Sequence, residues 1–129
     1  MSYALSIDLV QPFDEVVPQV KQALADNGFG IITEIDMQKT LKNKIDVEIG
    51  PHLILGACNP QFAHRALKIE PSIGLLLPCN VVLYEESEGH AVVGSVDPMQ
   101  TLAGAAESTA LAELARNVTV KLERALARL

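Results

Sequence analysis

The side chains best suited to chemistry in this sequence are the thiols of its two cysteines, Cys58 and Cys79. Cys58 ends a predicted strand and directly precedes a predicted helix, whose free N–H groups stabilise a thiolate. We therefore expect Cys58 to be the more reactive thiol. Cys79 begins another strand and has no helix of its own. If the two strands run antiparallel, both thiols lie at one edge of the sheet.

Polar side chains accompany the thiols along the chain. Asn59 follows Cys58, Asn80 follows Cys79, and Asp97 follows the strand predicted to pair with that of Cys79. Because a hairpin brings these strand ends together, the sequence predicts one candidate ligand-binding or redox site made of Cys58, Asn59, Cys79, Asn80 and Asp97. Three interpretations stay open: a thiol redox pair or soft-metal site, a ligand pocket without thiol chemistry, or buried cysteines beneath loops whose Asn and Asp only cap helices and turns.

The histidines give little support to a metal site. His52 and His90 lie about 20 Å of strand away from the thiols. His64 is near enough, but it is expected on the solvated side of its helix. The spacing therefore does not favour a zinc or copper site, and we predict no metal and no cofactor.

Motifs for other catalytic chemistry are missing from the sequence. There is no GxSxG, HExxH, phosphate-binding loop or GxGxxG pattern. Glu85, Glu86 and Glu88 cluster at a predicted hairpin tip, where we expect a solvated turn and not the pocket that paired catalytic acids require. These observations lean against an enzyme.

Periodicity and turn residues predict the elements that position the thiols. The predicted strands span residues 3–10, 29–35, 52–58, 79–86 and 90–96. The predicted helices span a segment capped by Asp14 and ended by Asn27-Gly28, then residues 37–43, 60–70, 98–102 and 105–129. Asp36, Asn59 and Asp97 are predicted helix caps.

The C-terminal helix carries an apolar stripe that must pack on a sheet. Its members are Leu111, Leu114, Val118, Leu122, Leu126 and Leu129. The helix after Cys58 is expected to turn Phe62, Ala63, Ala66 and Leu67 inward. We predict a single α+β domain over residues 1–129, with a curved, mainly antiparallel sheet, helices on one face and short inserted helices.

Composition limits the partners. A net charge of −6 and a pI near 4.9 argue against nucleic acid. No apolar run reaches the ~20 residues of a membrane span, and the first residues lack a signal-peptide pattern, so a cytoplasmic location is expected. Apolar strands outnumber the helices available to cover both sheet faces, which predicts a homodimer.

Three segments carry a resemblance to a known family: Leu53-Ile-Leu-Gly-Ala-Cys-Asn-Pro60, Ile73-Gly-Leu-Leu-Leu-Pro-Cys-Asn-Val-Val-Leu-Tyr-Glu85 and Val96-Asp-Pro98. Through them the chain resembles domain-of-unknown-function family 302 over essentially its whole length. The resemblance implies a fold akin to half of the TATA-binding protein (TBP), with a long helix held by a four- or five-stranded antiparallel sheet, and a tendency to dimerise. It implies no established activity.

Together these features favour a small-molecule or ion-binding module that acts as a homodimer, with its pocket between the sheet and the long helix. One alternative is a thiol-based redox or soft-metal-binding protein that uses Cys58 and Cys79. Another is a structural or adaptor dimer with no site.

Overall fold

The computed structural model describes residues 3–102 and 109–129. The strands of these ranges are β1 (Ala4–Leu9), β2 (Gly30–Asp36), β3 (His52–Cys58), β4 (Cys79–Ser87) and β5 (His90–Val96). The helices are α1 (Phe13–Asp26), α2 (Met37–Ile45), α3 (Pro60–Ile69), the 3-10 helix η1 (Pro71–Leu76), α4 (Pro98–Thr101) and α5 (Thr109–Ala127). The predicted start of the last helix at Ala105 lies outside the described residues.

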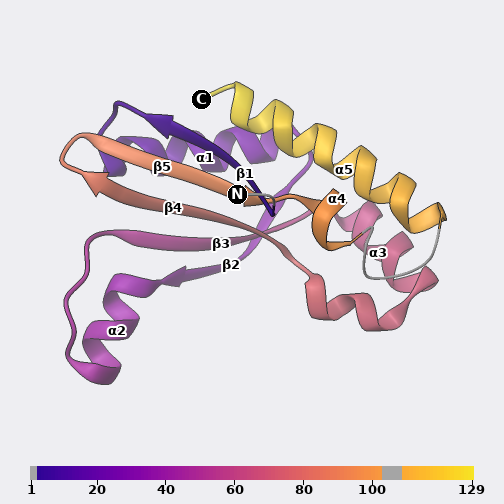
Figure 1. Ribbon diagram of the computed structural model, residues 1–129, viewed down its shortest axis with the longest axis horizontal. Coiled ribbons are helices and arrows are strands. Elements are labelled where there is room, and N and C mark those ends of the chain that lie inside the picture. The colour runs from indigo at the N-terminus through magenta and orange to yellow at the C-terminus, as the bar shows by residue number, and fades with distance from the viewer. Residues whose placement is uncertain (1–2, 103–108) are drawn as a thin grey trace.

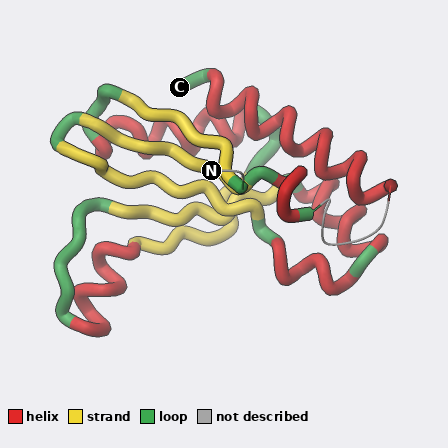
Figure 2. Tube along the Cα trace, in the orientation of Figure 1, coloured by secondary structure: helices red, strands yellow, loops and turns green. Residues whose placement is uncertain are grey.

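The described strands form one antiparallel sheet in the order β1-β5-β4-β3-β2 (Figures 1 and 2). The sheet is curved and open, and α1 and α5 pack against each other and against it. This architecture confirms the predicted α+β class, with the long C-terminal helix on one sheet face.

Strand register decides which side chains face the helices. Leu55, Val81 and Ser95 are successive cross-strand partners on the helix-covered face, and all three are buried. Their neighbours alternate to the opposite face, as successive side chains of a strand must. That opposite face, called here the open face, carries Val82 and Gly94 in the same register.

Helix caps set several of the element boundaries. Asn59 Oδ1 accepts a hydrogen bond from the N–H of Phe62 at 3.1 Å, and Asp36 and Asp97 cap α2 and α4 in the same way. Each cap satisfies one N–H group that the first helical turn leaves unpaired. The capping predictions for these three residues are confirmed.

The predicted cap of the first helix is wrong. Pro12, not Asp14, precedes α1, and no side chain caps it. The carbonyl of Pro12 accepts from the N–H groups of Glu15 and Val16, so the helix begins before Asp14, which lies in its first turn. Burial of Phe13 against the core favours this earlier start.

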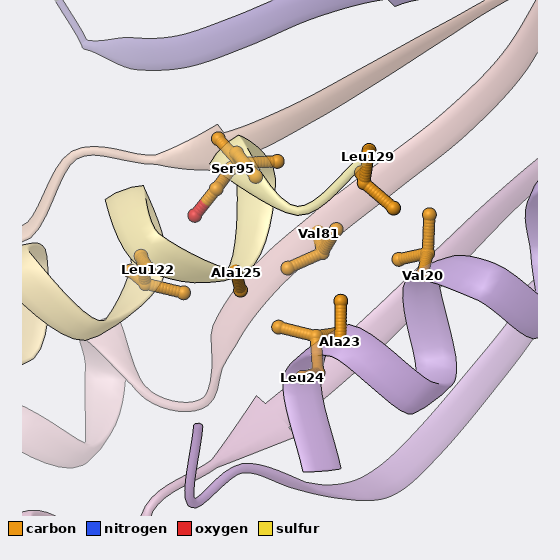
Figure 3. A pocket seen from close by; sticks show the side chains of 9 residues that line it. Val20, Ala23, Leu24, Val81, Ser95, Leu122, Ala125 and Leu129 are labelled. Carbon is orange, nitrogen blue, oxygen red and sulfur yellow. The ribbon is translucent and has the colours of Figure 1, made fainter. Parts of the chain in front are cut away.

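Figure 3 shows the part of the core where α1, α5 and the sheet meet. Small side chains lie here on both helices, Ala23 on α1 and Ala125 on α5, and they are buried together with Leu122 and Val81. The cavity left among them is only about 10 Å³, scarcely room for one water molecule. This cavity is too small for the ligand pocket that the sequence predicts between the sheet and the long helix.

Candidate functional site

The two cysteines lie on neighbouring antiparallel strands at one end of the sheet. Cys79 is the cross-strand partner of Ala57, and Cys58 is the next residue of β3. The strand that delivers Cys58 stops there because Asn59-Pro60 starts α3. The antiparallel arrangement that a joint site requires is present.

Cys58 and Cys79 both line one cavity, which we call the cysteine pocket. It has a volume of about 270 Å³ and lies at the ends of β3 and β4, beside α3. Most of its wall is apolar and comes from elements far apart in the sequence: Phe29, Ile32, Phe62, Leu67, Leu77 and Pro78. A cavity of this kind excludes water from one side of a bound molecule.

The two thiols differ in their surroundings. Cys79 is buried, whereas Cys58 is half-buried. Burial, and secondarily the nearby Cys58, raises the pKa of the Cys79 thiol from 9.0 to about 11. Cys79 therefore keeps its proton at neutral pH and is a poor nucleophile.

Asn59 lies on the wall of the cysteine pocket and is 9% exposed. Its side-chain oxygen is already used to cap α3. Among the described residues that line the pocket, Asn59 is the polar one besides the two cysteines.

The other two predicted site residues are placed elsewhere. Asn80 is the neighbour of Cys79 on β4, so its side chain emerges on the open face, opposite Gly56. Asp97 caps α4 through the N–H of Met99, and its own N–H donates to the carbonyl of Tyr3 at 2.8 Å. The structure thus brings together Cys58, Asn59 and Cys79, but not Asn80 or Asp97.

The histidines stay away from the thiols. His64 is exposed on α3, as predicted, and His52 stacks on Tyr84 with ring centroids 5.4 Å apart. Within residues 3–102 and 109–129, no group of three or more His, Cys, Asp or Glu side chains could hold a metal ion. Over the same ranges, no helix has the length and hydropathy needed to cross a bilayer.

Comparison with known proteins identifies the family of this chain. It matches the family described as Domain of unknown function DUF302 over residues 5–129. The chain belongs to this family. It is also similar to a solved structure, the uncharacterized conserved protein DUF302 from Bacillus stearothermophilus, with a TM-score of 0.88 and 29% sequence identity. The similarity covers 99% of this chain and 98% of that one. A search of the curated proteins found no match.

Several residues that line the cysteine pocket were not predicted from the sequence. Phe29 and Ile32 come from the β2 region, which the sequence links to the thiols only through sheet order. Leu67 was expected to point into the core, yet it is 40% exposed because it borders the pocket.

Proposed function

We propose that this DUF302 protein binds a small, largely apolar molecule in the cysteine pocket and acts as a homodimer. The observation that supports binding is a cavity of about 270 Å³ lined mostly by apolar residues, together with Cys58, Cys79 and Asn59. Ligand pockets of proteins have this composition, with a few polar groups that orient the ligand. The volume suits a molecule about the size of one aromatic ring system.

The mouth of the pocket supports the same proposal. Ile32 is 61% exposed and Leu67 is 40% exposed, although both are large apolar side chains. Covering them with an apolar ligand would remove this surface from water, which favours binding. Cys58, half-buried on the wall, would contact the ligand with a polarisable sulfur atom.

Indole, used as a probe, should bind the cysteine pocket saturably, and filling the pocket should abolish binding. Ala63 lines the pocket on α3, so the Ala63→Leu variant places extra carbon atoms inside it. Methyl NMR spectra of the wild-type protein should show indole-dependent shifts at Ile32, Leu67 and Leu77. Ala25→Leu makes the same change on the exposed side of α1 and should bind indole like the wild type. Equal binding by both variants would contradict the proposal.

A thiol redox function is the second candidate, because both thiols line one pocket. In that reaction each thiol loses a proton, a disulfide bond forms, and two electrons pass to an oxidised low-molecular-weight disulfide. The raised pKa of Cys79 weighs against this reaction at neutral pH. Native mass spectrometry of protein purified without added ligand distinguishes the candidates: an extra bound mass supports the ligand, and a mass lower by two hydrogen atoms supports the disulfide. A bare, reduced mass supports a structural dimer.

The open face of the sheet is the surface we propose for the second copy. Val82, Gly94 and the stacked pair His52 and Tyr84 border a shallow hollow of about 410 Å³ there. At the outer strands, Tyr3 is 57% exposed and Ile35 is 44% exposed. Two such faces related by a two-fold axis would bury this apolar surface in a self-complementary contact.

Light scattering at micromolar concentration should therefore give a dimer mass for the wild-type protein. Val82→Glu places a charge at the centre of the open face and should shift the protein towards the monomer, because an unpaired buried carboxylate is costly. Val10→Glu makes the same change at a residue that is 80% exposed, and it should leave the dimer intact. A monomer mass for the wild type would show the dimer proposal to be wrong.

A further inference from the structure

A second hollow lies between the start of α3 and the outer side of α5, and we call it the basic groove. Its volume is about 370 Å³. Its polar lining consists of side chains that can donate hydrogen bonds: Asn59, Gln61, Arg65, Asn117, Lys121 and Arg124. No Asp or Glu is among the described residues that line it.

None of the ion pairs between described residues involves a cation of this groove. Three of the chain's ten basic residues gather here, although the net charge is −6. The ion pairs among the described residues involve Lys21, Lys42 and Arg128 instead. A local concentration of unpaired positive charge on an acidic protein attracts an anion from solution.

The side-chain amide nitrogen of Asn59 is a hydrogen-bond donor without a partner among the described residues. The residue is 9% exposed, and its oxygen caps α3, but its Nδ2 makes no hydrogen bond to a described residue. Among the described residues no fully buried polar side-chain atom lacks a partner, so this nitrogen is reachable from outside. An amide donor that is mostly buried and unpaired gains a full hydrogen bond when an acceptor arrives.

The same nitrogen converges with the ammonium group of Lys121. A Cβ built on Gly28 would stand 3.3 Å from Asn59 Nδ2 and 3.9 Å from Lys121 Nζ. Both nitrogens therefore lie beside Gly28, and since each is a donor, neither can accept from the other. An anion on the groove side of the two groups would accept from both.

The N-terminus of α3, which carries the positive end of the helix dipole, lies at the basic groove. It has ten residues, and its first turn begins at the groove with Pro60 and Gln61. The N–H of Gln61 has no carbonyl one turn earlier to bond within the helix. Free N–H groups and the helix dipole favour phosphate and similar anions at such an end.

We propose that the basic groove binds a phosphate group, either as inorganic phosphate or as the phosphoryl group of a monoester. The anion lies between Asn59 Nδ2, Lys121 and the first turn of α3, and Arg65 and Arg124 complete its surroundings. The site shares only Asn59 and Phe62 with the cysteine pocket. Its existence does not depend on the function proposed above, and Ala63→Leu should leave it intact.

Amide NMR titration at constant ionic strength tests the site, with inorganic phosphate and phenyl phosphate as probes and chloride as the reference anion. Saturable shifts are expected at Gln61, Phe62 and the side-chain amide of Asn59. Tighter binding of phenyl phosphate would identify a monoester as the occupant, and equal binding would identify the free anion. The exposed Lys121→Gln variant should bind about tenfold more weakly, the usual loss for one charge-assisted hydrogen bond.

Two further variants make the test specific. Asn59→Asp keeps the oxygen that caps α3 but replaces the donor by a carboxylate oxygen, so phosphate binding should be lost while the fold remains. Arg116→Gln removes the same charge from an exposed site on α5 outside the groove and should bind like the wild type. The proposal is overturned if neither probe gives saturable shifts, or if Arg116→Gln weakens binding as much as Lys121→Gln. If Asn59→Asp unfolds, Lys121→Gln alone decides.

Discussion

Replacing Leu122 by alanine should lower the free energy of unfolding by about 2–5 kcal/mol, the usual cost of truncating a buried leucine. Leu122 is 1% exposed and lies where α5 meets α1 and the sheet. The neighbouring cavity is only about 10 Å³, so the surrounding side chains are already in contact with one another. They cannot collapse far into the space that the truncation leaves, which places the cost towards the upper part of the range. Urea unfolding of the two proteins measures it.

Val120→Ala is the matched control on the same helix. Val120 is 42% exposed and two residues away from Leu122. Its truncation removes little buried surface, and alanine favours helix more than valine does, so the unfolding free energy should change by less than about 0.5 kcal/mol. If Leu122→Ala unfolds at the same urea concentration as the wild type, the stripe does not form the core.

The strand and helix boundaries around the thiols were predictable because they are set by local chemistry. Asn59-Pro60 and Asp97-Pro98 each place a capping side chain before a residue that has no N–H to leave unpaired. Such pairs end a strand and begin a helix whatever the rest of the fold does. The α+β class followed from the strand pattern and the stripe on the last helix.

Features that depend on how elements fit together were not predictable. The sequence contains Ala23 and Ala125, but it does not show that they face each other and close the space expected to hold a ligand. Leu67 belongs to the apolar stripe of α3, yet it lines the cysteine pocket and is not part of the core. The 3-10 helix over Pro71–Leu76 was missed because an apolar run is equally compatible with a strand.

The candidate site was only partly predictable, because it too depends on how the elements pack together. Chain order brought Cys58 and Cys79 to one edge, but strand alternation sends Asn80 to the opposite face. The basic groove gave no sequence signal at all. Arg65 and Lys121 lie on different helices, and only their packing across α3 and α5 brings them to one hollow.

Raising the pH from 8 to beyond 11 should lower the free energy of unfolding by about 2–3 kcal/mol through Cys79 alone, because the fold raises the pKa of its thiol from 9.0 to about 11. Burial, with a smaller effect of Cys58, raises the pKa of this thiol from 9.0 to about 11. Between these values the unfolded chain loses the proton while the folded chain keeps it. The folded state then binds more protons, so stability falls as pH rises. The contribution of the protonated Cys79 thiol to stability is fully present below about pH 9 and is lost as the pH rises through about 11.

Urea unfolding as a function of pH, in the presence of a reductant, measures this contribution when the wild type is compared with a variant that lacks the Cys79 thiol. The Cys79→Ala variant lacks the ionisable group, so its stability should fall less steeply between pH 9 and 11 than that of the wild type. Cys58→Ala is the matched control: because burial is the main cause of the shift, this variant should keep most of the wild-type slope. Parallel curves for the wild type and Cys79→Ala would mean that the Cys79 thiol is not held neutral by the fold. The pocket would then be open enough to water for that thiol to ionise. The raised pKa would no longer weigh against the thiol redox function.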